Sequence, residues 1–191
     1  MNVFEPSSYR EVRVTHTDVP GLLVIGMEVR PEGRGWFKEN FKREKFESLG
    51  FPAGFEIVQN NISYHAQRGA TRGIHAKPYD QFITIASGSV FAAIVDLRAG
   101  DGFGKTASFE LNPGISLFIP RACGQAFQSL ESDTAYSSMM NGYDSPDTPT
   151  TSINLWDAEL NVQWPIPLEW AEVAESDKSH PNLKDIQPIQ S

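Results

Sequence analysis

Short apolar stretches separated by turn residues dominate the chain after residue 55. Residues 81–97 predict two strands joined by a turn at residues 87–89. Further strands are expected at residues 55–63, 109–111, 115–119, 126–130 and 135–140, with glycine, proline or aspartate between most of them. Strands this short and this frequent are typical of a β-sandwich or barrel. The pattern therefore predicts an all-β fold.

The remaining patterned segments are one strand and two helices. Residues 21–30 are rich in branched side chains and end at Pro31, which predicts a single strand. Residues 37–49 place two apolar pairs at helical spacing among charged residues and end before Gly50, which predicts a short surface helix. Residues 167–175 begin with proline and predict a last short helix.

Length and charge narrow the class of protein. The 191 residues contain no internal repeat, linker or low-complexity tract, so a single domain over residues 1–191 is expected. The net charge of -8 argues against binding to nucleic acid or to anionic membrane surfaces. The longest uncharged stretch, residues 81–95, is too short to span a bilayer.

Cysteine content and the first residues indicate the compartment. The single cysteine, Cys123, excludes an internal disulfide and fits a reducing environment. Residues 1–10 carry charges and a proline where a secretion signal requires an apolar core. A cytoplasmic location is therefore expected.

His75 is the strongest candidate for chemistry among the four histidines. It follows Arg72 by three residues and precedes the long apolar strand pair. On a regular strand, positions 73 and 75 share one face and positions 72 and 74 the other. Strand periodicity alone therefore leaves open whether Arg72 and His75 reach the same cavity, and whether His75 is chemical or structural.

Several segments, in their order and spacing, resemble the dTDP-4-dehydrorhamnose 3,5-epimerase family, whose members invert carbons 3 and 5 of a nucleotide-linked 4-keto-6-deoxy sugar. The matching segments are GRGWFKENF (33–41), QNNIS (59–63), RGIH (72–75), VDLR (95–98), IP (119–120), WD (156–157) and HPNLKD (180–185). The resemblance implies an all-β, cupin-type jelly-roll β-barrel with short flanking helices. It also implies a homodimer, a role in dTDP-rhamnose and deoxysugar biosynthesis, and catalysis without a cofactor.

The resemblance implies a role for two catalytic residues. His75 matches the family's catalytic base, and Asp157 matches the carboxylate expected to pair with it. A carboxylate on one ring nitrogen fixes the tautomer and stabilises the imidazolium that forms after proton abstraction. A histidine, with a reference pKa of about 6.5, is suited to take a proton from a carbon next to a ketone near neutral pH.

Six further residues match positions that bind the dTDP-linked sugar in the family. Arg34 and Arg72 are expected at the diphosphate and the sugar, because guanidinium groups suit phosphate oxygens. The others are Gln59 and Asn61 at the thymine, and Phe37 and Glu39 beside the nucleotide sugar. The alternative interpretation makes Phe37 a core residue and Glu39 a solvated charge.

Two positions depart from the family pattern. The family's lysine, which stabilises the enolate, is Gln81 here, and the family's proton-donating tyrosine is Ser138. Tyr136 lies two residues before Ser138 and points to the same face, where it is expected to line the barrel. A glutamine can donate a hydrogen bond but brings no charge.

A metal site of the cupin type is not expected. Such barrels place a second histidine close to the first, but Ala76 and Lys77 follow His75, and Gln125 stands where a later histidine would be. Aliphatic, cationic and amide side chains are poor ligands for zinc or iron. The sequence therefore predicts that His75 acts without a metal.

Three functions are consistent with these residues. The first is a 3,5- or single-carbon epimerase of a dTDP-linked 4-keto-6-deoxyhexose. The second is a nucleotide-sugar binding module that has lost efficient catalysis through the changes at Gln81 and Ser138. The third is an isomerase of another nucleotide sugar.

Overall fold

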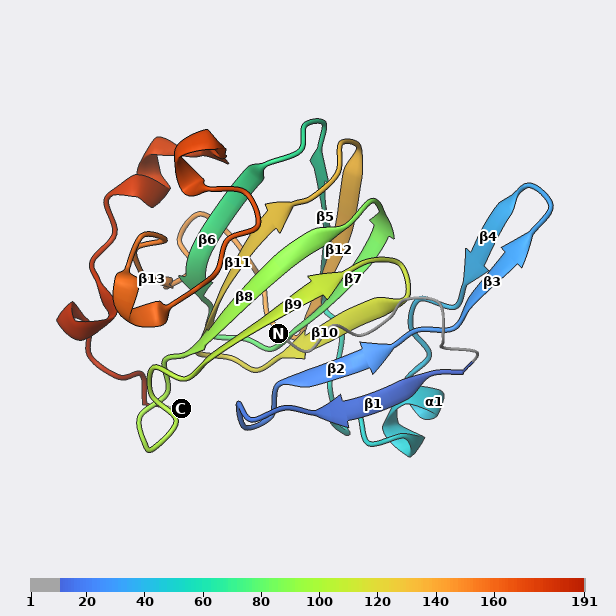
Figure 1. The fold of residues 1–191 in the computed structure, drawn as a ribbon. Helices are drawn as coiled ribbons and strands as arrows, with labels where there is room; N and C mark the ends of the chain where they lie inside the picture. The colour runs from blue at the N-terminus through green and yellow to red at the C-terminus, as the bar shows by residue number, and fades with distance from the viewer. Residues whose placement is uncertain (1–10, 191) are drawn as a thin grey trace.

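The computed structural model describes residues 11–190, so the residues on which the expected absence of a secretion signal rests lie outside it. Two six-stranded sheets enclose a barrel (Figure 1). The first sheet runs in the order β1 (Arg13–His16), β2 (Leu23–Gly26), β10 (Ile115–Ile119), β7 (Gln81–Ser87), β12 (Thr134–Met140) and β5 (Gln59–His65). The second runs β13 (Thr151–Ser152), β6 (Ala70–Ala76), β11 (Cys123–Ser129), β8 (Val90–Asp96) and β9 (Thr106–Leu111), and β14 (Glu172–Val173) adds to β6 in parallel. The all-β prediction is confirmed.

Helical segments are few and short within residues 11–190. They are α1 (Arg43–Ser48) and four 3-10 turns, η1 (Ala158–Leu160), η2 (Leu168–Trp170), η3 (Glu175–Lys178) and η4 (Leu183–Asp185). No helix in this part of the chain has the length and apolar character needed to cross a membrane.

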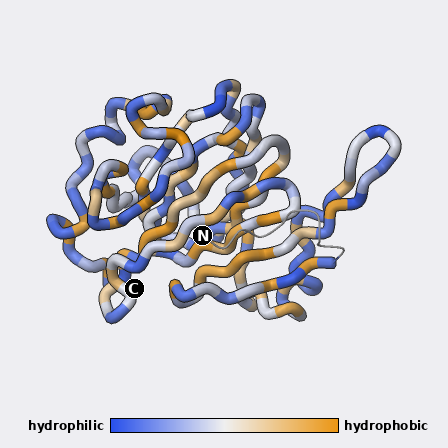
Figure 2. Tube along the Cα trace, viewed as in Figure 1, coloured by the Kyte–Doolittle hydropathy of each residue, from blue (hydrophilic) through white to orange (hydrophobic). Residues whose placement is uncertain are grey.

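Hydrophobic side chains fill both the barrel and its outer faces, as the hydropathy along the strands shows (Figure 2). All seven residues of β8 are buried. Val90, Ala92 and Ile94 belong to the cluster between the sheets, whereas Val95 packs under the C-terminal segment. Burial on both faces explains why β8 is continuously apolar instead of alternating.

Two predicted elements are wrong in their boundaries near the N-terminus. The single strand expected at residues 21–30 is two strands, because Met27 donates to Gly114 O and the chain then leaves the sheet. Residues 29–32 form β3 (Val29–Glu32), which pairs with β4 (Gly35–Lys38) in a separate hairpin. The helix expected from residue 37 therefore begins only at Arg43.

The helix expected at residues 167–175 is also wrong. Only η2 is helical there, and the following Glu172 and Val173 pair with Ala70 and Thr71 of β6. The backbone is in a strand conformation at this point because Glu172 and Val173 add a short strand beside β6. This pairing directs the next residues along β6, toward His75.

The hairpin formed by β3 and β4, here called the arm, projects from the barrel (Figure 1). Its base is fixed by Lys38, whose Nζ donates to Thr84 Oγ1 and to Ile85 O, both at 2.8 Å. Burial lowers the pKa of Lys38 to about 8. Trp36 and Phe37 on the arm are 45% and 52% exposed, which is unusual for large apolar side chains.

Candidate active site

A cavity of about 220 Å³ opens between the two sheets at the end of the barrel where β6, β7 and β12 meet. It is lined by Asn61, Ser63, Arg72, His75, Lys77, Tyr79, Gln81, Ile83, Gln125, Phe127, Tyr136, Ser138, Met140 and Asp144. Arg72 and His75 also line an adjoining groove of about 780 Å³, on the side of β14 and η3. Arg72 and His75 therefore line both spaces.

An irregularity in β6 brings Arg72 and His75 to the same cavity. In the pairing with β11, Gln125 lies opposite His75 and Phe127 lies opposite Arg72, so two residues of β6 face one residue of β11. Such a bulge shifts the alternation of side chains by one position. This bulge explains how Arg72 and His75, which a regular strand would place on opposite faces, both line the cavity.

Gly73 is required at the break. Its φ is +126°, and a Cβ added there would lie 2.5 Å from the Cβ of Ala126 and 2.6 Å from the Cα of Ala126. No other residue type fits this close approach between β6 and β11. The RGIH segment therefore combines a conformational requirement at Gly73 with the two functional side chains around it.

The side chain of His75 has a partner on each ring nitrogen. Nδ1 lies 2.9 Å from Ser152 Oγ on β13, and Nε2 lies 3.3 Å from Asp177 Oδ1 on η3. Asp177 is itself buried, and its Oδ2 accepts the Gly73 N–H at 3.2 Å. An ionised carboxylate can only accept, so both contacts of a neutral ring are satisfied when Nε2–H donates to Asp177 and Nδ1 accepts from Ser152.

The electrostatic environment favours the neutral form of His75. Burial is the largest influence and lowers the pKa of His75, whereas Asp177 raises it. The charges of His180 and Lys77 lower the pKa further. A neutral imidazole with one free lone pair is the form in which a histidine can accept a proton.

The predicted pairing of His75 with Asp157 is wrong. Asp157 lies at the start of η1, where Oδ1 accepts from Glu159 N at 3.0 Å and Oδ2 accepts from Leu183 N at 2.7 Å. Its carboxylate is thus engaged in capping η1 and holding the C-terminal segment. The carboxylate that contacts His75 comes instead from Asp177.

The two departures from the family pattern meet inside the cavity. Ser138 Oγ donates to Gln81 Oε1 at 3.1 Å, and both residues are buried. The expectation that Tyr136 lines the barrel on the same face as Ser138 is confirmed, and its ring packs against Phe127 at a centroid distance of 5.2 Å. Ser138 therefore holds the amide oxygen of Gln81 in place.

Lys77 brings a positive charge to the same cavity. Its Nζ lies 3.0 Å from Asp144 Oδ1, and its charge is close enough to His75 to affect the histidine. Asp144 is held by Gln59, whose Oε1 accepts from Asp144 N at 2.9 Å and whose Nε2 donates to Asn61 Oδ1 at 3.0 Å. The predicted residues Gln59 and Asn61 are therefore part of one network with Lys77.

Gln125 adds an unpaired acceptor. Its Oε1 is buried without a hydrogen-bond partner among the described residues, although the residue lines the cavity. A buried acceptor without a partner costs about 1–3 kcal/mol. A ligand that donates a hydrogen bond there would remove this cost.

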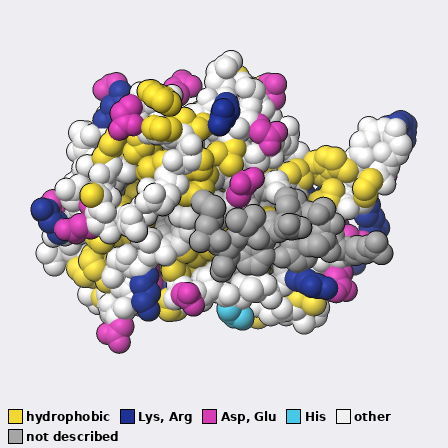
Figure 3. Space-filling model, viewed as in Figure 1, with side chains coloured by type: hydrophobic (Ala, Val, Ile, Leu, Met, Phe, Trp, Pro, Cys, Tyr) yellow, Lys and Arg dark blue, Asp and Glu magenta, His cyan; other side chains and the backbone are white. Residues whose placement is uncertain are grey.

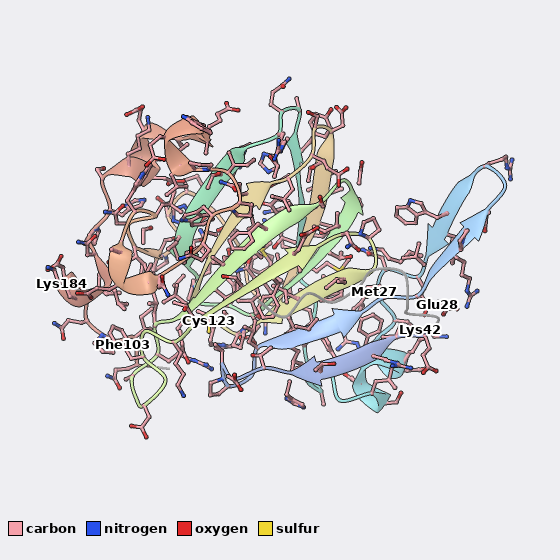
Figure 4. All side chains as sticks on the ribbon, in the orientation of Figure 1. Met27, Glu28, Lys42, Phe103, Cys123 and Lys184 are labelled. Carbon is pink, nitrogen blue, oxygen red and sulfur yellow. The ribbon has the colours of Figure 1, made fainter. Side chains whose placement is uncertain are left out.

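Three predicted residues lie away from this cavity. Arg34 lies in the turn of the arm and Phe37 in β4, while Glu39 follows β4 and accepts from Lys45 Nζ at 3.2 Å. The labels Glu28 and Lys42 in Figure 4 mark the base of the arm, which extends away from the barrel. The interpretation of Phe37 as a core residue is wrong, because its side chain is half exposed.

Cys123 is a small buried residue of the barrel. It belongs to the core cluster and lies opposite Asp96 at one end of β8, the end from which the loop with Phe103 projects (Figure 4). Burial raises the pKa of the Cys123 thiol to about 12, so the group is not a reactive thiolate.

Comparisons with known proteins identify the family. Residues 16–185 match the family model described as dTDP-4-dehydrorhamnose 3,5-epimerase. The chain is 38% identical to "Protein RmlC homolog" of Streptococcus pyogenes serotype M6, over 97% of this chain and 94% of that protein. It is 29% identical to the dTDP-4-dehydrorhamnose 3,5-epimerase of Sinorhizobium fredii, over 80% of each.

A solved structure supports the same assignment. RmlC from Streptococcus suis, in complex with dTDP-D-xylose, superimposes with a TM-score of 0.89 at 37% identity, covering 94% of this chain and 95% of that one. The jelly-roll prediction is thereby confirmed. Curated members of the family are dTDP-sugar 3,5-epimerases. This chain belongs to the dTDP-4-dehydrorhamnose 3,5-epimerase family.

Proposed function

We propose that this protein is a metal-independent epimerase that acts on a dTDP-linked 4-keto-6-deoxyhexose. The observation that carries the proposal is the contact between His75 and Asp177 at the edge of a cavity that also contains Arg72 and Gln81. The dTDP-sugar bound to the S. suis relative supports the substrate class. Family membership supports a role in dTDP-rhamnose biosynthesis, and the proposal places this role in the cytoplasm.

The reaction begins when His75 takes the proton from the carbon next to the keto group. The electrons of the broken C–H bond form a C=C bond, and the keto oxygen acquires the negative charge of an enolate. When Nε2–H donates to Asp177, the atom of His75 that accepts the substrate proton is Nδ1. The Ser152 hydroxyl, which contacts Nδ1, rotates away and frees it for this step. Asp177 stabilises the imidazolium that results.

A second proton then completes the inversion. Ser138 is a poor acid, so water protonates the opposite face of the carbon, and His75 returns its proton to the solvent. The absence of a tyrosine at position 138 favours epimerisation at one carbon over two. The stereochemical outcome is therefore a property of this protein's own cavity.

The enolate oxygen needs a donor and a positive charge. Gln81 donates its amide N–H to this oxygen while Ser138 holds Oε1, and Lys77 supplies the charge from the same cavity. Lys77 thus serves in place of the lysine that the family has at position 81.

Substitution of Lys77 by methionine tests this role. Loss of a charged donor to an oxyanion is expected to slow solvent exchange into the sugar by about 100- to 1000-fold, mostly in kcat. Lys184→Met, on the C-terminal segment (Figure 4), is the matched control and leaves the rate unchanged. Equal rates in the two variants, measured by NMR in heavy water, contradict the role of Lys77.

The nucleotide and sugar are held by the remaining polar groups. Gln59 and Asn61 read the thymine through their amides, and Arg72 pairs with the diphosphate and sugar region. Gln125 Oε1, unpaired in the described structure, accepts from a sugar hydroxyl. Arg34, Phe37 and Glu39 reach a bound nucleotide sugar only in a second copy of the chain.

A homodimer accounts for the exposed apolar surface. Trp36 and Phe37 on the arm are accompanied by Ile62 and Tyr64 of the edge strand β5, which are 71% and 58% exposed. In the space-filling view, apolar side chains gather at the base of the arm, and a basic side chain lies at its tip (Figure 3). Exposed apolar groups on an arm and on a sheet edge are typical of an interface between copies.

Light scattering is expected to give a mass twice the 21.2 kDa of one chain. Replacement of Trp36 and Phe37 by serine removes apolar contacts of the arm and is expected to shift the protein toward the monomer. A monomeric wild-type protein at micromolar concentration contradicts the dimer.

The alternative function is a nucleotide-sugar binding module. The observation that favours it is the pair of substitutions, Gln81 and Ser138, beside intact binding residues. Incubation with the dTDP-linked 4-keto sugar in heavy water, together with calorimetry using dTDP, separates the two functions. Deuterium next to the ketone supports the epimerase, binding without exchange supports the module, and neither binding nor exchange excludes both. A panel of other sugar nucleotides tests the third possibility, a different substrate.

A further inference from the structure

A second histidine approaches the pair formed by His75 and Asp177. His180 Nε2 lies 3.4 Å from Asp177 Oδ1, the same oxygen that His75 Nε2 approaches at 3.3 Å. The two rings are nearly perpendicular, with an interplanar angle of 82° and centroids 5.6 Å apart. The three ligand atoms all lie within 4.8 Å of one another.

The spacing of these atoms fits a small metal ion. A tetrahedral zinc ion with bonds of about 2 Å separates its ligands by about 3.3 Å. Both contacts to Asp177 already have this spacing. The ligand nitrogens of the two histidines lie at most 4.8 Å apart, so they have to approach each other by no more than about 1.5 Å to reach this spacing.

Each ligand is oriented by a further contact. Ser152 Oγ holds Nδ1 of His75, and Gly73 N–H donates to Asp177 Oδ2. The residue after His180 fixes its segment, because Pro181 O accepts from Asn154 N at 2.8 Å. Outer contacts of this kind hold metal ligands in position.

The charge balance permits a cation. Two neutral imidazoles and one carboxylate give the cluster a single negative charge. Lys77, whose charge influences His75, is paired with Asp144 at 3.0 Å. Two nitrogen donors and one oxygen donor favour zinc and related transition metals over magnesium or calcium, which take oxygen ligands.

We propose that His75, Asp177 and His180 bind a divalent transition-metal ion such as Zn²⁺, and that this ion inhibits the epimerase. The inhibition, unlike the binding, rests on the proposed function. An ion on Nε2 leaves the remaining ring proton on Nδ1, where it donates to Ser152. The lone pair that accepts the substrate proton is then lost, so metal binding and catalysis compete for His75.

Calorimetry with ZnCl₂ on the metal-free full-length protein tests the binding. One equivalent is expected to bind, and His180→Asn is expected to weaken binding by at least about tenfold. His16→Asn, on the exposed strand β1, is the matched control and binds as the wild type does. Zinc also raises the Tm of the wild type and of His16→Asn, but not of His180→Asn.

Absence of zinc binding by the wild type, or equal affinity in His180→Asn, overturns the proposal. His180→Gln serves in the same comparison if circular dichroism shows that His180→Asn does not fold. In the exchange assay, zinc is expected to stop deuterium exchange by the wild type, and EDTA is expected to restore it. Inhibition of His180→Asn, measured against its own metal-free rate, is expected to require at least about tenfold more zinc. A metal-free protein without exchange contradicts the proposed function alone, because calorimetry still decides the metal site.

Discussion

Asp177→Asn is expected to slow deuterium exchange into the keto sugar by about 100- to 10,000-fold. The asparagine presents either an amide oxygen or an amide N–H to Nε2 and no longer carries a charge. It therefore neither fixes the Nε2–H tautomer of His75 nor stabilises the imidazolium. The affinity for dTDP is expected to stay unchanged, because the nucleotide is held by other residues.

Asp157→Asn is the informative control for this experiment. Asparagine is a good capping residue, so the variant keeps the hydrogen bond that caps the start of η1. The side chain at position 157 stays as far from His75 as in the wild type. Its exchange rate is expected to equal that of the wild type, although its stability falls when the charged contact to Leu183 N is weakened. A large loss of exchange in Asp157→Asn and none in Asp177→Asn would reverse the assignment of the carboxylate.

Gly73→Ala is expected to lower the free energy of unfolding by about 2–5 kcal/mol. The added methyl group would meet both the backbone and the side chain of Ala126, at a positive φ that alanine disfavours. Relief of this contact separates β6 from β11 and moves Arg72 and His75 out of register, so exchange falls as well. Urea unfolding measures the change.

Gly35→Ala separates steric contact from backbone strain. Gly35 has a φ of +146°, but an added Cβ would meet nothing within 4 Å. Its loss of stability is expected to be smaller, at about 1–2 kcal/mol, because only strain contributes. Equal losses in the two variants would show that the approach of β6 to β11 is not a tight constraint.

Much of the fold was predictable because the strands of the barrel carry their own signals. The turn at residues 87–89 and the strands on either side were located from apolar runs and turn residues, and Ile115–Ile119 was predicted to the residue. The arm was not predictable from the same signals. Its apolar residues, among them Phe37, have the spacing of one side of a helix in the sequence. In the structure they are exposed on a hairpin.

The site was predictable only in part. His75 was identified by its neighbours, but Asp177 is one of 24 acidic residues and no local pattern distinguishes it. It reaches His75 because β14 pairs in parallel with β6 and directs η3 along that strand. His180 lies in the same C-terminal segment, and ligand spacing along the barrel strands gives no sign of it.

Despite the changes at Gln81 and Ser138, the cavity still contains a charged group and a phenol. Lys77 lies in the same cavity and carries the charge that Gln81 lacks. Tyr79, whose pKa is raised by burial and by Asp144, stays protonated and neutral beside it. The loop between β6 and β7 therefore contributes groups that the strand positions have lost.

Replacement of His75 by asparagine tests whether this histidine is the base. The wild type and His75→Asn are incubated with the dTDP-linked 4-keto sugar in heavy water, after calorimetry has shown that both bind dTDP equally. Deuterium is expected next to the ketone with the wild type, and the rate with His75→Asn is expected to be about 100- to 10,000-fold lower. Undiminished exchange in His75→Asn, or no deuterium with the wild type, would contradict the role of His75 as the base.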